Sequence, residues 1–279
     1  GIGGGMLWGY KNLSEFLDED QPVFAFSSRG HAGLPEHRTP RAMAEAYVHD
    51  MRSRQPSGPY AIGGYCFGGN VAYEMARVLE GMGETVDLLL LIDAYPFYEA
   101  GCQKALQLRS VGECVRFLTN FYHKLVGLGT LTKEDRQNHL RRMRRWLRLK
   151  FSRTPDDAHD AVKTLTDTAA YSKRQAALWE AHWQMYDDHV DGSYSGAAVL
   201  LRTRAQPVFS CHTQVLGWSR VIQGDLETIT IPGHHDALFV DPNVRFVADN
   251  VTARLRVRSR RTSTTGVRVQ AMPTADQFW

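Results

Sequence analysis

A cysteine between two glycines is the residue of this chain best suited to covalent chemistry. Residues 60–70 form a short apolar run, then Gly64-Tyr65-Cys66-Phe67-Gly68, then the start of a helical stretch. This spacing predicts a nucleophile elbow, a sharp strand-to-helix turn in which a Cβ at either glycine would collide with neighbouring backbone. The helix N-terminus would favour the thiolate of Cys66, the form that attacks carbonyl carbon. The alternative is a glycine-rich turn that only buries a cysteine.

A thiol nucleophile needs a base, and the base usually needs a carboxylate that fixes its tautomer. Asp93 directly follows 88–92, the most strand-like run of the chain, so it should lie at the same sheet edge as Cys66. The run 198–201 leads into residues 202–207, which contain no carboxylate, and Asp93 is therefore the preferred acid. A turn residue or helix N-cap is the alternative role of Asp93.

The base should come from a loop that carries two histidines. Residues 229–233 predict the end of another strand, and His234 and His235 follow directly. The chain order is then nucleophile, acid, base, as in α/β hydrolases. Chemistry alone leaves the choice between the two histidines open, because either ring could reach Cys66.

Short apolar runs separated by amphipathic stretches must position these residues. The runs predict strands at 23–26, 60–64, 86–92, 198–201 and 226–231, and helical periodicity is clear at 42–54 and 71–79. This alternation predicts an α/β fold with a mostly parallel sheet and helices on both faces.

Two regions depart from this pattern. Residues 97–191 show helical stripes and no strand-like run, which predicts an inserted helical subdomain. Its arginine-rich stretch 136–153 indicates either a solvated helix face or a docking surface for an acidic partner. The basic residues 256–279 have little periodicity, so we expect a disordered tail.

Composition sets limits on the class of protein. The 279 residues are 43% apolar and 23% charged, with a net charge of +3, which gives no case for nucleic acid or a membrane surface. The four cysteines lack metal-ligand spacing and the density of a disulfide scaffold, so a reducing cytoplasm fits best. We expect no metal and no bound cofactor.

Several motifs together resemble one enzyme family. From residue 2 to about 255, the chain is similar to the type I thioesterase domains of nonribosomal peptide and polyketide synthetases. The matching pieces are Ile2-Gly3-Gly4-Gly5, Tyr10-Lys11-Asn12-Leu13, Gly58-Pro59-Tyr60, Gly64-Tyr65-Cys66-Phe67-Gly68-Gly69, Leu91-Ile92-Asp93, Leu216-Gly217-Trp218 and Ile231-Pro232-Gly233-His234-His235. The resemblance implies an α/β-hydrolase fold over 1–255, with residues 97–191 as a helical lid.

The resemblance also assigns roles. It selects His235 as the base and leaves His234 as a loop residue near the site. It implies an oxyanion hole made of the Phe67 amide and an amide at Ile2, with Gly3 as the neighbouring possibility. It implies a substrate carried on the phosphopantetheine of a carrier protein.

The lid should cover an acyl channel. Tyr186, Tyr194 and Gly196 match the stretch where the lid returns to the core. Four aromatic residues are candidates to line the channel, although aromatic residues at helical spacing are more often plain core: Phe97, Tyr98, Trp179 and Trp183.

The chain departs from the family in two ways. Cys66 stands where family members usually carry serine, which is either a natural or an engineered difference. The apolar strand that precedes the Ile-Gly-Gly motif in the family is not in this sequence, so we expect a fragment of a longer polypeptide with a carrier domain upstream.

The favoured function is release of an acyl, peptidyl or polyketide chain from a carrier protein through a Cys66 acyl-enzyme, by hydrolysis or by cyclisation, including lactone formation. The alternatives are an editing thioesterase that clears stalled acyl groups and a non-catalytic binding module.

Overall fold

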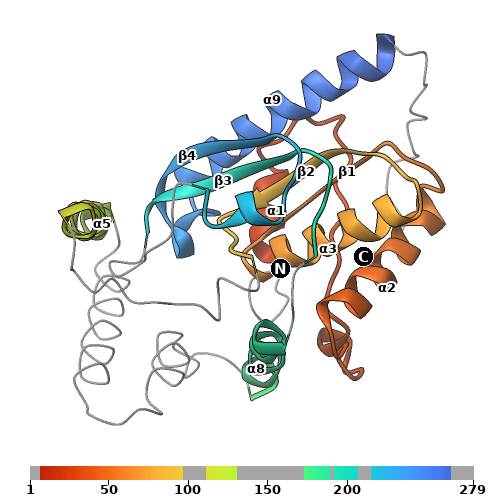
Figure 1. Ribbon diagram of the computed structural model, residues 1–279, viewed down its shortest axis with the longest axis horizontal. Coiled ribbons are helices and arrows are strands. Elements are labelled where there is room, and N and C mark those ends of the chain that lie inside the picture. The colour runs from red at the N-terminus through yellow and green to blue at the C-terminus, as the bar shows by residue number, and fades with distance from the viewer. Residues whose placement is uncertain (1–6, 97–110, 131–172, 189–191, 207–214, 265–279) are drawn as a thin grey trace.

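The computed structural model of the chain describes residues 7–96, 111–130, 173–188, 192–206 and 215–264 (Figure 1). These ranges contain a layered α/β arrangement. None of the described helices is both long enough and apolar enough to cross a membrane.

A four-stranded parallel sheet forms the middle layer. Its strands lie in the order β1 (Tyr60–Tyr65), β2 (Val86–Ile92), β3 (Ala198–Ala205) and β4 (Leu226–His234). Tyr65 pairs with Ile92, and Ile92 pairs with Leu201, so the carboxyl ends of the first three strands meet along one edge. Residues that follow these strands are therefore brought together, as the sequence predicted.

Helices cover both faces of the sheet (Figure 1). Helix α9 (Asn243–Thr264) and the short α1 (Trp8–Ser14) lie on one side, and α3 (Phe67–Gly81) with α2 (Pro40–Arg54) lie on the other. The side chains of β2 show why the sheet is buried on both faces. Leu88 and Leu90 pack in the cluster with α9, whereas Leu89 and Leu91 pack in the cluster with α3. A third cluster joins α2 to α3.

The described parts of residues 97–191 contain two helices, α5 (Val111–Thr130) and α8 (Lys173–Asp188). Helix α5 packs against β3 and β4. The basic stretch 136–153 lies outside the described residues.

The strand predicted at 23–26 is wrong. This segment has no assigned secondary structure and no strand pairing with the described residues, and the side chains of Val23 and Phe24 are exposed. β propensity alone does not make a strand, because a strand needs a neighbour that shares its hydrogen bonds.

The tail predicted from residue 256 is wrong in its first part. Helix α9 continues to Thr264, because Leu255 packs against the sheet cluster and Arg256 forms a two-pronged ion pair with Asp18 at 2.8 and 3.0 Å. Residues 265–279 lie outside the described residues.

The turn between β1 and α3 requires two glycines. A Cβ on Gly64 would lie 2.0 Å from the carbonyl oxygen of Gly68, and one on Gly69 would lie 2.5 Å from the Ala94 Cβ. Cys66 sits between them with φ 54°, in the left-handed region that non-glycine residues rarely adopt. Close packing of strand against helix therefore holds Cys66 in this conformation. Gly64 has no room for a Cβ, as the sequence predicted. Gly69 in the helix has no room either, and the sequence pattern did not single out this position.

Gly64→Ala should lower the free energy of unfolding by about 3 kcal/mol or more, because the clash is with backbone and no rotamer change relieves it. Urea denaturation of the purified chain measures this. Gly81→Ala is the control: it lies in the same helix with nothing within 4 Å of an added Cβ, and should be neutral or stabilising by up to about 1 kcal/mol. Equal stability of the two variants would contradict the packing argument.

Candidate active site

Cys66 and His235 meet at the carboxyl edge of the sheet. Cys66 is the N-cap residue of α3, and His235 follows β4 at the start of a short 3-10 helix, η4 (His235–Ala237). His235 acts on the pKa of the Cys66 thiol through its charge and its side chain, and Phe67 acts on it through its backbone N–H. The nucleophile candidate thus has both a base and a backbone donor beside it.

The thiol and the imidazole shift each other's pKa in opposite directions. Burial alone would raise the pKa of Cys66, but the charge of His235 and its hydrogen bond outweigh burial and lower that pKa below its ordinary value. Burial would lower the pKa of His235, but Cys66 and Asp93 raise it well above its ordinary value. Both shifts favour a thiolate–imidazolium pair.

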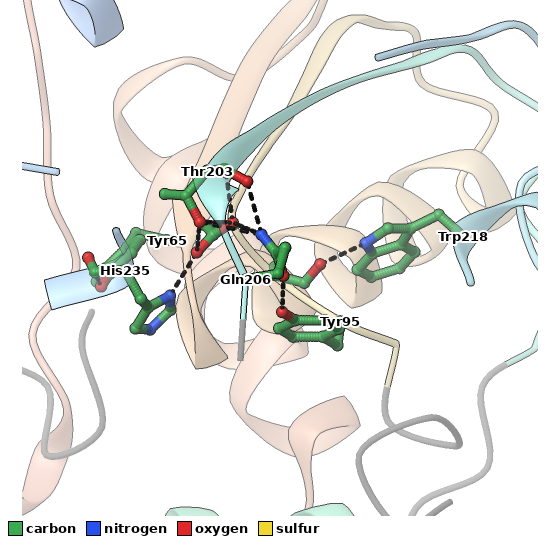
Figure 2. Close-up of polar contacts among 8 residues, drawn as sticks. Tyr65, Tyr95, Thr203, Gln206, Trp218 and His235 are labelled. Carbon is green, nitrogen blue, oxygen red and sulfur yellow. Dashed lines mark hydrogen bonds and ion pairs between the residues drawn. The ribbon is translucent and has the colours of Figure 1, made fainter. Parts of the chain in front are cut away.

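Asp93 holds the other side of the imidazole (Figure 2). Its Oδ2 lies 2.7 Å from the Nδ1 of His235. The backbone N–H and hydroxyl of Thr203 donate to the carboxylate at 2.8 and 3.0 Å, and the Gln206 side-chain amide donates at 3.2 Å. Burial would raise the pKa of this carboxyl, but the bonds from His235 and Thr203 lower it below its ordinary value. Asp93 is therefore an ionised group inside the protein, with only 1% of its surface exposed.

The loop that carries Asp93 is fixed along its length. Asp93 has φ 43°, a left-handed conformation that costs about 1 kcal/mol or more. Ala94 accepts a 2.8 Å hydrogen bond from the buried indole of Trp218, and the Tyr95 hydroxyl donates to the Gln206 side chain (Figure 2). These bonds offset the backbone strain and hold the loop that positions the Asp93 carboxylate.

Tyr65 fixes the histidine loop. Its hydroxyl donates to the His235 carbonyl at 2.6 Å, and its ring packs 4.6 Å from the imidazole. Its own N–H donates to the Tyr10 hydroxyl at 2.9 Å. The residue directly before Cys66 therefore positions the loop that carries His235.

A second polar cluster connects helix α8 to the residue after the nucleophile. The His182 ring, from α8, stacks on the Phe67 ring at 4.5 Å and 7°. The Nε2 of His182 lies 3.5 Å from Glu36, which also accepts from the Ser28 hydroxyl and from the His37 N–H. Burial would raise the pKa of Glu36, but the bonds from His182, Ser28 and His37 lower it to about 2. The ring stack thus ties α8 to the start of α3, and the contact with Glu36 ties α8 to the segment 28–37.

The structure brings four of the predicted site residues together: Cys66, Asp93, His235 and Phe67. His234 is not at the carboxylate; it ends β4 and pairs with Ala205. The predicted oxyanion residue Ile2, with Gly3, lies outside the described residues.

The other predicted residues have different outcomes. Tyr194 is buried against Tyr73 in the α3 cluster and belongs to the core, whereas the partly exposed Gly196 lies against the Tyr194 ring. Trp179 is half-buried on α8. Phe97 and Tyr98 lie outside the described residues, as do the side chains of Trp183 and Tyr186.

Sequence reasoning missed the partners of Asp93 and the α8 cluster. Residues 202–207 offered no carboxylate, and the polar side chains of Thr203 and Gln206 were given no role. A signal existed, since polar residues at the end of an otherwise apolar strand need a buried partner. Within the described ranges, no three His, Cys, Asp or Glu side chains are grouped as metal ligands.

Comparison with known proteins bears on the family and the fold of this chain. A family model described as "Thioesterase domain" matches residues 1–255. A dimodular nonribosomal peptide synthase of Bacillus subtilis (strain 168) is 39% identical over 94 residues, 33% of this chain and 4% of the relative. An atromentin synthetase of Tapinella panuoides is 41% identical over 88 residues, 31% of this chain and 9% of the relative. An inactive atromentin synthetase of Paxillus involutus is 39% identical over 92 residues, 33% of this chain and 10% of the relative. These matches span a tenth or less of each relative.

Solved structures share the fold. The NocB thioesterase domain, in covalent complex with a fluorophosphonate nocardicin G analog, has a TM-score of 0.55 at 24% identity, and the match covers 91% of this chain and 90% of that one. A four-domain nonribosomal peptide synthetase, holo-AB3403, has a TM-score of 0.61 at 21% identity over 90% of this chain and 18% of that one. The predicted α/β-hydrolase fold is confirmed, and the chain belongs to the thioesterase-domain family.

Proposed function

We propose that the chain releases an acyl, peptidyl or polyketide chain from the phosphopantetheine of a carrier protein through a Cys66 acyl-enzyme. The observation that carries this proposal is the 2.7 Å contact between Asp93 and His235, which in turn lowers the pKa of Cys66. The names of two relatives, a nonribosomal peptide synthase and an atromentin synthetase, support a carrier protein as partner. Since another relative is named inactive, the proposal depends on these residues rather than on similarity.

In the first half-reaction, the Cys66 thiolate attacks the carbonyl carbon of the carrier thioester. The negative charge that develops on the carbonyl oxygen would be stabilised by the Phe67 amide and a second amide at Ile2 or Gly3, at about 3 kcal/mol per donor. Collapse of the intermediate breaks the bond to the pantetheine sulfur, which takes the proton of His235 as it leaves. The acyl group is now on Cys66.

In the second half-reaction, neutral His235 removes a proton from the incoming nucleophile. That nucleophile is water in hydrolysis, or a hydroxyl or amine of the acyl chain in cyclisation. It attacks the Cys66 thioester, the carbon–sulfur bond breaks, and the thiolate–imidazolium pair is restored. Asp93 stays ionised throughout and stabilises the imidazolium.

Sulfur in place of oxygen changes the energy of the intermediate. Transfer from one thioester to another is nearly neutral, whereas transfer to serine would give a more stable oxoester. The acyl group on Cys66 therefore remains activated for release, which suits attack by a weak nucleophile or closure of a strained ring.

The proposed ion pair predicts how Cys66 reacts with iodoacetamide as pH changes. Because the pKa of Cys66 is lowered, its alkylation should persist below the ordinary thiol range and fall only when acid protonates the thiolate. His235→Gln removes the group that lowers this pKa and leaves burial, so alkylation at neutral pH should slow by about tenfold or more. Peptide mass spectrometry measures the rate at Cys66, with the exposed Cys114 as reference in the same sample.

His234→Gln is the matched control and should keep the Cys66 profile. If His235→Gln reacts like the unmodified chain, Cys66 and His235 do not form the proposed ion pair.

Cys66→Ser and Cys66→Ala test the covalent role. With an acyl-pantetheine thioester, the unmodified chain should gain the acyl mass and release product, whereas Cys66→Ala should do neither. Cys66→Ser should release product more slowly, because its oxoester intermediate is more stable. Intact-protein mass spectrometry and product analysis follow both steps. If Cys66→Ser releases the same product at an equal or higher rate, the thioester on Cys66 gives no advantage in the release step.

A further inference from the structure

A cavity of about 450 Å³ lies between α5 and the carboxyl ends of β3 and β4. Figure 1 shows α5 beside the ends of these two strands. Its volume is in the range of small-molecule sites, about 300–1,000 Å³. The polar residues that line it are Thr119, Asn120, His123, Arg202, Arg204 and Thr230.

The polar side chains reach the cavity from two elements. Arg202 and Arg204 are two residues apart on β3, so they share a face, while Thr203 between them faces Asp93. Thr230 pairs with Arg202 across the β3–β4 ladder and lies on that same face. From α5, Asn120 and His123 are three residues apart and share a side of the helix.

The lining has an excess of positive charge and hydrogen-bond donors. None of the described lining residues is acidic. Within the described ranges, the Arg204 guanidinium pairs with no carboxylate, and each guanidinium offers five N–H donors and no acceptor. Desolvation and the nearby charge of Arg204 lower the pKa of His123, which favours the neutral imidazole. The positive charge of the lining therefore comes from the two arginines, and an anion bound here would balance it.

One lining residue lies within reach of the charge of Asp93. Burial lowers the pKa of Arg202, and the charge of Asp93 acts in the opposite direction. A substrate group held by Arg202 and Arg204 would lie near the carboxyl end of β3, on the face of the sheet opposite to the Thr203 side chain.

We propose that this cavity binds an oxyanion group of the substrate, a carboxylate or a phosphate, through Arg202 and Arg204. Carboxylates and phosphates match the planar fork of arginine, which can donate two parallel hydrogen bonds to them. The group has two sources, an acidic side chain of the acyl moiety or the phosphate of phosphopantetheine. The cavity is much larger than either group, so it also has room for the adjoining chain. This inference rests on the proposed function, which supplies the thioester substrate.

Binding of unreacting probes to the full chain with Cys66→Ala tests the proposal. One pair of probes is glutaryl-pantetheine thioester and its methyl ester, which differ in the carboxylate. The other pair is 4′-phosphopantetheine and pantetheine, which differ in the phosphate. Isothermal titration calorimetry gives the affinity ratio of the anionic to the neutral member of each pair.

We expect about a tenfold ratio for the pair that carries the true ligand group, decreasing with added salt. Arg204→Gln should reduce this ratio to about twofold or less, and Arg204→Lys should retain part of it because the charge remains. Arg38→Gln, an exposed arginine outside the cavity, should keep the full ratio. Thermal melting of each variant identifies any loss of folding.

A ratio near one for both pairs, or an unchanged ratio in Arg204→Gln, overturns the proposal. Failure of the proposed function gives a different result: the unmodified chain would then not be acylated at Cys66 by either the glutaryl thioester or its methyl ester. Acylation by both, without discrimination in binding, rejects only the oxyanion site.

Discussion

A buried, ionised carboxylate is the constraint on which the rest of the site depends. An ionised group out of water is strongly destabilising unless partners satisfy it, and every partner of Asp93 described above comes from another strand end. Thr203 lies on β3, Gln206 directly follows it, and His235 follows β4. The ionised state of Asp93 thus depends on the register of β2, β3 and β4. A slip of β3 by one residue would turn Thr203 away and put an arginine in its place.

The fold was largely predictable because its signals are local. The run 86–92 is apolar almost throughout, as a strand buried on both faces must be, and it became β2 with the same bounds. Helices α2 and α3 follow from periodicity. Helix α2 also has an N-cap, because the Thr39 side chain accepts a hydrogen bond from the Ala42 N–H, and Pro40 is its first residue. The run 23–26 was wrong because strand formation depends on a neighbour that propensity does not reveal. The extension of α9 beyond residue 255 was missed because Arg256 pairs with Asp18, which is far away in sequence.

The residues of the candidate site were predictable for a different reason: glycine spacing and strand ends restrict where Cys66, Asp93 and His235 can lie. The choice of His235 over His234 required the family resemblance, and only the folded structure shows which imidazole meets Asp93 at 2.7 Å. The supporting residues Thr203, Gln206, Glu36 and His182 were missed. The polar end of an apolar strand was a signal for Thr203 and Gln206, but no local pattern marks Glu36 and His182, which meet only when distant segments pack.

The stack of His182 on Phe67 couples the position of α8 to the surroundings of Cys66. Phe67 directly follows Cys66, and His182 belongs to a helix between β2 and β3, so the stacked rings join that helix to the start of α3. Any displacement of α8 must pull the stacked rings apart and leave the carboxylate of Glu36 without its imidazole neighbour. A movement of α8 is consequently also a change in the packing next to Cys66.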